Sequence, residues 1–298
     1  MRIRRFSFFP GTWPARCLAS GVMTLASMHA AEPPFLSGAV AVDGGLTIDE
    51  QPRTGGGSFG GDWQLAEARV FLRPHVAVRL GLGVGASREA YHTKDLDHDL
   101  PDDVRHAWVR VPIAVMVHQH WGMTVQGSFG TGYGSDASAS DGRQWQVQGG
   151  PLYVRDDDLI IALLVNVSSR IDDEPSIFAF PSLYWRFHPD WRLTVVDEVD
   201  NLSHLRWQVR DDLDLGLRVD VRLRDAAISN SQALSDDHVA IGLQATWMPG
   251  GRGGIEITPV IGTMVMRRLA VRDDEGKEQW SLITRPAPLV GLNLRASF

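Results

Sequence analysis

The sequence of 298 residues has little cysteine and lacks long apolar runs. Cys17 is its one cysteine, so an intramolecular disulfide is excluded. No stretch reaches the run of about 18 uncharged apolar residues that a transmembrane helix needs. A strongly amphipathic helix and a domain linker are also lacking, so we expect a single domain without membrane-spanning helices.

What the sequence has instead is a repeated period of two. In Leu213–Arg224 (LDLGLRVDVRLR), apolar residues alternate with polar residues or glycine throughout. This pattern predicts a β-strand with one apolar and one polar face. Similar runs recur from Trp63 to the C-terminus, and a weaker one covers residues 37–48. We therefore expect residues 32–298 to form an all-β, antiparallel up-and-down transmembrane β-barrel of about 12–14 strands.

The lengths of these runs indicate an outer membrane. A strand tilted by about 45° needs about eleven residues to cross an apolar band of about 25 Å. The runs have about this length, roughly twice that of an ordinary globular strand. Short turns alternate with longer connections at 87–103, 133–142, 168–176, 225–237 and 271–286.

Aromatic residues fall at the ends of the expected strands, which is typical of the girdles at the two membrane interfaces. They are Trp63, Trp121, Tyr133, Tyr184, Trp185, Trp191 and Trp247. We expect the bacterial outer membrane as the location and its lipid as a partner. The alternative is a soluble periplasmic ligand-binding β-barrel, which would place its apolar face inside.

Residues 1–31 have the features of a secretory signal peptide. Basic residues at the start are followed by the apolar segment Cys17–Met28 and by the small residues Ala30 and Ala31. Removing residues 1–31 takes away four arginines and no acid, which changes the formal charge from −7 to −11. A mature chain this acidic is a poor general binder of nucleic acid, so we expect no nucleic-acid partner.

Charged residues on the polar face must point into the barrel, because an arginine on the lipid face costs about 2–4 kcal/mol at the midplane. The candidates for lining the lumen are Arg79, Arg110, Arg206, Arg210, Arg218, Asp220, Arg222 and Arg224. Such residues can pair with one another and fill a structural lumen, or they can line a small pore that passes small solutes. An excess of arginine in a pore would favour anions. The sequence leaves both alternatives open.

Motifs for metal binding and catalysis are weak. Asp95, Asp97 and Asp99 have the spacing of the first ligands of a calcium loop, but Leu100 and His106 replace its glycine and its bidentate glutamate. These aspartates remain weak candidates for loose divalent-cation binding. We expect no catalytic residue, no metal and no cofactor, and hence no enzyme. The rival hypothesis, an outer-membrane enzyme of the lipase or protease type, needs a Ser/His or Asp/His pair at one rim.

The chain ends in LVGLNLRASF, in which Val290, Leu292, Leu294, Ala296 and Phe298 share one face. This ending resembles the C-terminal signal by which outer-membrane barrels are recognised for assembly. The resemblance implies the barrel-assembly machinery as a partner, with Phe298 as the recognised residue.

Three segments resemble an uncharacterised bacterial family, a domain of unknown function with the features of porin-like outer-membrane barrels. They are residues 111–136 (VPIAVMVHQHWGMTVQGSFGTGYGSD), 178–207 (FAFPSLYWRFHPDWRLTVVDEVDNLSHLRW) and 287–298 (APLVGLNLRASF) together with Arg267 and Arg268. The resemblance covers residues 60–298. It implies a porin-like barrel with passive solute passage or a structural role, and the family has no established substrate or catalytic residue to carry over.

Overall fold

The fold is known from a computed structural model that describes residues 35–97, 99–169, 171, 175–196, 202–229, 231–251 and 254–298. The expected signal peptide, residues 1–31, lies outside this described part and stays a prediction. In the described part, no helix has the length and apolar character that crossing a membrane requires.

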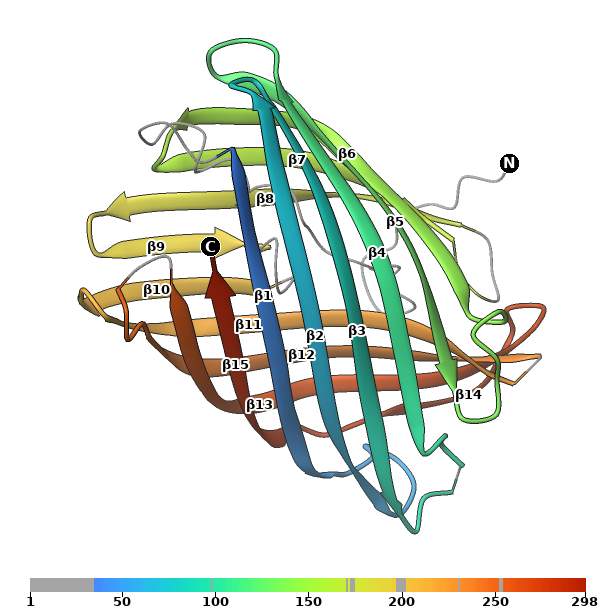
Figure 1. The fold of residues 1–298 in the computed structure, drawn as a ribbon. Coiled ribbons are helices and arrows are strands. Elements are labelled where there is room, and N and C mark those ends of the chain that lie inside the picture. The colour runs from blue at the N-terminus through green and yellow to red at the C-terminus, as the bar shows by residue number, and fades with distance from the viewer. Residues whose placement is uncertain are drawn as a thin grey trace.

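The described chain is an all-β barrel (Figure 1). Its strands are β1 (Leu36–Glu50), β2 (Ser58–His75), β3 (Val78–Lys94), β4 (Asp103–Met116), β5 (Trp121–Gly134), β6 (Arg143–Asp156), β7 (Leu159–Ser168), β8 (Ser176–His188), β9 (Trp191–Val195), β10 (Leu202–Arg210), β11 (Leu213–Ser229), β12 (Gln232–Trp247), β13 (Ile255–Asp273), β14 (Glu278–Ile283) and β15 (Ala287–Ser297). Sequential strands from β1 to β14 pair antiparallel, and β1 pairs with β15.

Pairing of β12 with β13 closes the sheet into a barrel. β14 and β15 both pair with β13, β14 along Arg268–Arg272 and β15 along Ile255–Met264. They therefore occupy one strand position, and the barrel has fourteen positions. This confirms the expected barrel of about 12–14 strands, including a first strand at residues 37–48.

The two ends of the barrel differ. Five connections at one end are short: 76–77, 117–120, 157–158, 189–190 and 211–212. Both Phe35 and Phe298 lie at this short-turn end, because Arg73 N donates to Phe35 O at 2.9 Å and Gly38 N donates to Phe298 O at 2.8 Å. The opposite, long-loop end carries the connection between β1 and β2 and those after β3, β5 and β7.

The apolar face of the strands points outward. On β11, Leu215 and Leu217 are exposed, whereas Asp214, Arg218 and Asp220 on the other face are buried. A soluble barrel would have the opposite arrangement, so the alternative of a soluble periplasmic barrel does not fit this fold. An apolar exterior around a polar interior is the arrangement of an outer-membrane β-barrel.

Three expected long connections are shorter in the structure. Residues 225–237 were expected to form a polar loop, but β11 and β12 continue as a hairpin and leave two residues between Ser229 and Gln232. The expected loop 271–286 contains β14, and β3 extends to Lys94 within the expected loop 87–103. These predictions were wrong because polar inward residues continue the strands past the apolar belt, where the contrast between faces is weak.

The barrel narrows towards its long-loop end. The last pair between β10 and β11 is Leu202 with Asp220, and farther along β11 Ala227 pairs in parallel with Tyr133 of β5. Gln144 Nε2 also donates a 2.9 Å hydrogen bond to the carbonyl oxygen of Asp225. β5 and β6 therefore meet β11 directly at this end, although β7 to β10 lie between β6 and β11 in the order of the sheet.

Apart from a smaller cluster of Trp63, Ala240, Val260, Met264 and Leu289, two apolar clusters lie in the interior on either side of its middle. The long-loop end holds Phe59, Tyr91, Val104, Ala226, Leu234, Leu269 and Val271. The other cluster lies mostly on the β6–β8 wall and holds Ala114, Leu152, Val154, Ile160, Ala162, Leu164, Phe180, Tyr184 and Val196. The charged side chains lie between and beside these clusters.

Some of the expected girdle aromatics point inward. At the short-turn end, the rings of Trp191 and Trp207 stack at 5.8 Å between centroids, and the rings of Trp185 and Phe187 lie 5.4 Å apart. Trp185 and Trp207 are exposed, as expected for an interface. Trp63 and Tyr184, however, are buried inside the barrel. Their assignment to the girdle was wrong because an aromatic residue near a strand end can belong to either face.

Candidate functional site

The charged interior of the barrel is the candidate functional site. Arg218, Asp220 and Arg222 are buried on the inward face of β11. Arg222 Nη2 lies 2.9 Å from Asp220 Oδ2 and 2.8 Å from Asp43 Oδ2. Arg218 Nη2 lies 3.3 Å from Asp220 Oδ2 and 3.5 Å from Asp43 Oδ2. Asp43 belongs to β1, which β12, β13 and β15 separate from β11, so these ion pairs join two walls across the lumen.

A second group of ion pairs has Arg267 of β13 at its centre. The Arg267 guanidinium lies 3.1 Å from Glu50 Oε1 and 2.7 Å from Glu89 Oε1, and it also bonds Asp236. The hydroxyl of Tyr91 donates to Asp236 Oδ2 at 2.8 Å. Arg267 is almost completely buried. One guanidinium therefore links the carboxylates of β1, β3 and β12, which lie on different walls.

Smaller ion pairs occupy the rest of the interior. Arg69 Nε lies 2.6 Å from Glu67 Oε1, and Arg110 Nη1 lies 3.6 Å from the same oxygen. On other strands, Arg192 pairs with Asp214. Each of these arginines has its carboxylate within the barrel, so the arginines of the inward face are largely charge-paired.

The remaining predicted lumen residues have different surroundings. Arg79 is buried, with its guanidinium 4.2 Å from the centroid of the Phe71 ring. Arg206 Nη1 lies 3.8 Å from Glu256 Oε2, and Arg224 Nη1 lies 3.5 Å from Glu89 Oε2.

Arg210 lies apart from the other predicted lumen residues. It is exposed at the short-turn end and pairs with Asp212 at 3.1 Å. Arg210 is thus placed at the rim, whereas the other seven predicted residues lie on the inward face.

Two pockets border the charged residues of the interior. One has a volume of about 150 Å³ and is lined by Glu67, Trp108, Arg110, Gln146, Arg222 and Arg224, among others. The other, of about 10 Å³, lies beside Asp43 and Arg218. The first pocket is half-open, and its lining includes the exposed side chains of Phe129 and Trp145, so it reaches the surface of the barrel.

Asp43 and Glu67 lie in expected strands but were not singled out, whereas Glu89 and Asp236 were missed because their segments were assigned to loops. Glu89 follows Arg79 at an even spacing and therefore lies on the same face of β3, but the strand was expected to end at Ala86. Asp236 was placed in the expected loop 225–237. Continuing the period of two through these segments would have found both residues. The expected excess of arginine inside the barrel arose from the same omission.

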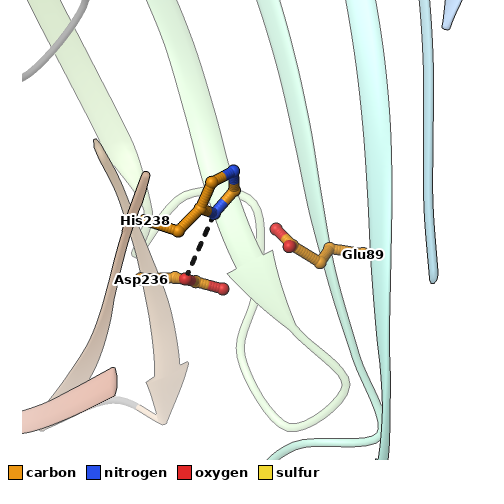
Figure 2. A group of neighbouring side chains, drawn as sticks. All are labelled: Glu89, Asp236 and His238. Atoms are coloured by element: carbon orange, nitrogen blue, oxygen red, sulfur yellow. Dashed lines mark ion pairs between the residues drawn. The ribbon is translucent and has the colours of Figure 1, made fainter. Parts of the chain in front are cut away.

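The weak metal candidates Asp95, Asp97 and Asp99 are exposed in the connection between β3 and β4. Asp97 Oδ2 accepts a 3.5 Å hydrogen bond from Gly56 N. Within the described ranges, the three ligand-type side chains that come together are instead Glu89, Asp236 and His238, all buried (Figure 2). The long-loop side of the chain also carries an exposed Asp/His pair, in which Asp62 Oδ2 and His92 Nε2 are 2.9 Å apart.

Phe298 forms the last backbone hydrogen bonds between β15 and β1 at the short-turn end. Its amide donates to Gly38 O at 3.0 Å, and its carbonyl oxygen accepts a 2.8 Å hydrogen bond from Gly38 N. The side chain is 68% exposed. The backbone of Phe298 thus completes the seam between β1 and β15, while its ring is available to a partner.

No family model matches the chain, and no curated protein matches it. The resemblance to an uncharacterised family therefore stays a prediction. Solved structures of bacterial barrels are similar. The P. putida toluene transporter TodX is 9% identical, with 93% of this chain and 92% of that chain covered and a TM-score of 0.46.

Two further barrels are similar over most of their length. The translocator domain of the autotransporter NalP from Neisseria meningitidis is 9% identical, with 93% of this chain and 92% of that chain covered and a TM-score of 0.35. The KdgM porin is 8% identical, with 87% of this chain and 99% of that chain covered and a TM-score of 0.30. Likenesses this distant concern the fold alone and do not indicate what this chain binds or transports.

Proposed function

We propose that this outer-membrane barrel is a porin-like, non-enzymatic protein whose lumen is held closed by ion pairs across it. The observation that carries the proposal is the bond between Arg222 of β11 and Asp43 of β1. Together with the carboxylates bound by Arg267, it fills the middle of the barrel. Small solutes pass only when these pairs separate, and the closed state gives the barrel its rigidity.

The balance of charge inside the barrel supports low conductance. A buried guanidinium beside a buried carboxylate leaves little net field, so neither anions nor cations are drawn into the lumen. Asp43 and Asp220 offset Arg218 and Arg222, which removes the anion preference that an excess of arginine would give. We assign no solute, and any solute that passes must be small.

Conductance in planar bilayers tests this proposal. The wild-type barrel should show little ohmic conductance. Arg222→Ala should raise it several-fold, because the side chain that spans the lumen is removed and water enters. The new current should prefer cations, since Asp43 and Asp220 then share the single arginine Arg218 and leave one net negative charge.

Arg210→Ala is the matched control, because Arg210 pairs with Asp212 at the exposed rim. It should conduct like the wild type. Folding of each protein is checked by its mobility on a gel with and without boiling. A wild-type barrel that conducts as an open pore would contradict the closed lumen. A folded Arg222→Ala barrel without increased conductance would favour a purely structural barrel.

We further propose that the barrel-assembly machinery recognises β15 through Phe298. The ring is exposed, whereas the backbone bonds to Gly38 do not depend on it. Phe298→Ala should therefore lower the amount of folded protein in the outer membrane several-fold. The purified variant should still refold in detergent with the stability of the wild type.

A loss of folded protein in the outer membrane without a loss of stability in detergent would show that Phe298 acts in recognition by the machinery and not in stabilising the barrel. Phe35→Ala is the control, because Phe35 is also exposed at the short-turn end but lies at the start of the barrel. Equal outer-membrane levels of the Phe298→Ala variant and the wild type would contradict the proposal that Phe298 is recognised during assembly.

A further inference from the structure

Three buried side chains with metal-ligand atoms meet inside the barrel. Glu89 comes from β3, and Asp236 and His238 come from β12 (Figure 2). One ligand atom from each lies within 4.8 Å of the other two. All three side chains are at most 5% exposed. This group lies apart from the weak candidates in the connection between β3 and β4.

The fold explains why these residues meet. Asp236 and His238 are two positions apart on β12, so their side chains leave the strand on the same, inward face. Glu89 lies on the inward face of β3, which is not a neighbour of β12 in the sheet. The narrow long-loop half of the barrel brings the two walls close enough for their side chains to meet.

His238 has an unused ligand atom. Its Nδ1 is buried and has no hydrogen-bond partner. The nearest carboxylate oxygen, Asp236 Oδ1, is 3.7 Å away, which is beyond hydrogen-bond distance. Leaving a buried polar atom unpaired is unfavourable, and Figure 2 shows this nitrogen on the side that faces Asp236. A bound cation would supply the missing partner.

The net charge around Glu89, Asp236 and His238 is negative, which favours a bound cation. Three carboxylates, those of Glu50, Glu89 and Asp236, surround Arg267, and Arg224 approaches Glu89 at 3.5 Å. These five groups carry one net negative charge. Each carboxylate can accept about four hydrogen bonds or ligand contacts, so the bonds to Arg267 do not use up its oxygens. Arg267 holds Glu89 and Asp236 in place beside His238.

We propose that Glu89, Asp236 and His238 bind a divalent transition-metal ion of the zinc type. Imidazole and carboxylate ligands suit zinc, with bonds of about 2.0–2.2 Å, and three protein ligands leave a fourth position for water. Small rotations of the side chains bring atoms that lie within 4.8 Å to the spacing that such bonds need. The ion links β3 to β12 across the lumen and stabilises the closed barrel.

The test uses the full barrel, purified with a tag that lacks histidine, refolded in detergent and stripped with EDTA. Titration with zinc chloride in a calorimeter should give one site per chain. Zinc should also raise the temperature at which the barrel unfolds on a gel, whereas magnesium should not, because an imidazole ligand disfavours magnesium. The absence of saturable zinc binding to the wild type would overturn the proposal.

Variants separate this site from other zinc-binding groups on the protein. His238→Ala and Glu89→Gln should each weaken zinc binding at least tenfold. His92→Ala is the matched control, because His92 forms an exposed Asp/His pair with Asp62 and has no third ligand beside it among the residues that the structure describes. Zinc binding that survives both His238→Ala and Glu89→Gln, or that His92→Ala removes, would refute the site. If one of the two interior variants does not fold, the other decides.

Discussion

Replacing Arg267 with methionine is expected to destabilise the barrel by about 3–5 kcal/mol, the usual cost of removing one partner from a buried ion pair. Methionine has a similar length but no charge. Glu50, Glu89 and Asp236 would then remain buried without the guanidinium that bonds all three. The measurement is the urea midpoint of the barrel refolded in lipid vesicles. EDTA in all samples excludes any effect of bound metal.

The adjacent Arg268 offers a close control. It pairs with Glu278, which lies near the surface. A partly exposed pair contributes about 0–1 kcal/mol, so Arg268→Met should shift the midpoint little. Arg267→Lys should fall between the two variants, because it keeps the charge but loses the planar set of donors. Equal stability of Arg267→Met and Arg268→Met would show that the buried ion pairs do not hold the walls together.

Placing an arginine at Leu243 is expected to impair insertion of the barrel into a membrane. Leu243 is 64% exposed and pairs with Ile261 on the outer face. It lies four residues from Trp247, an exposed aromatic at the short-turn end of β12. At a rise of about 3.3 Å and a tilt of about 45°, this is about 9 Å into an apolar band of about 25 Å. An arginine near the midplane costs about 2–4 kcal/mol.

The same substitution distinguishes a lipid-facing surface from a water-facing one. On a soluble protein, arginine at a position this exposed would cost almost nothing. The measurement is the folded fraction in lipid vesicles, read from gel mobility with and without boiling, and the urea midpoint. Val76→Arg is the control, because Val76 is 68% exposed in the turn between β2 and β3, beyond the strands. If both variants fold equally well, the outer face is not in contact with lipid.

The two substitutions probe opposite faces of the barrel wall, on the paired strands β13 and β12. Arg267 acts through charge pairing in the interior, and Leu243 acts through contact with lipid. A barrel that tolerates neither change depends on both surfaces, as a membrane barrel with a packed lumen should. This combination also explains why an inward arginine is tolerated at position 267, whereas an outward one at position 243 is not.

Strand positions and faces could be predicted where the outside is apolar and the inside polar. Leu213–Arg224 has this contrast at every residue, and the structure places it in β11 with the predicted faces. The contrast arises because one face meets lipid and the other meets charged partners. Seven of the eight residues predicted to line the lumen lie on the inward face in the structure, and Arg210 lies at the rim. The pairing of the last strand with the first was not predicted.

Beyond residue 224, exposed apolar residues no longer alternate with buried polar ones, because Asp225, Ala226 and Ala227 are all buried. There β11 meets β5 as well as β12, so side chains of both faces are covered. A period of two is not visible in such a segment, and the end of the strand could not be located. The acidic residue Asp236, in the partner strand of that hairpin, was lost for the same reason.

The all-β class, the outward apolar face, the approximate number of strands and most of the inward arginines could be predicted from the sequence alone, because each follows from the period of two. Tertiary structure decided which charges meet. Asp43 reaches Arg222, and Glu89 reaches both Arg267 and the vicinity of His238, from strands far apart in the chain. Alternation fixes a side chain's direction within its own strand. Its partner across the lumen depends on the closure, tilt and narrowing of the whole barrel, which no local pattern records.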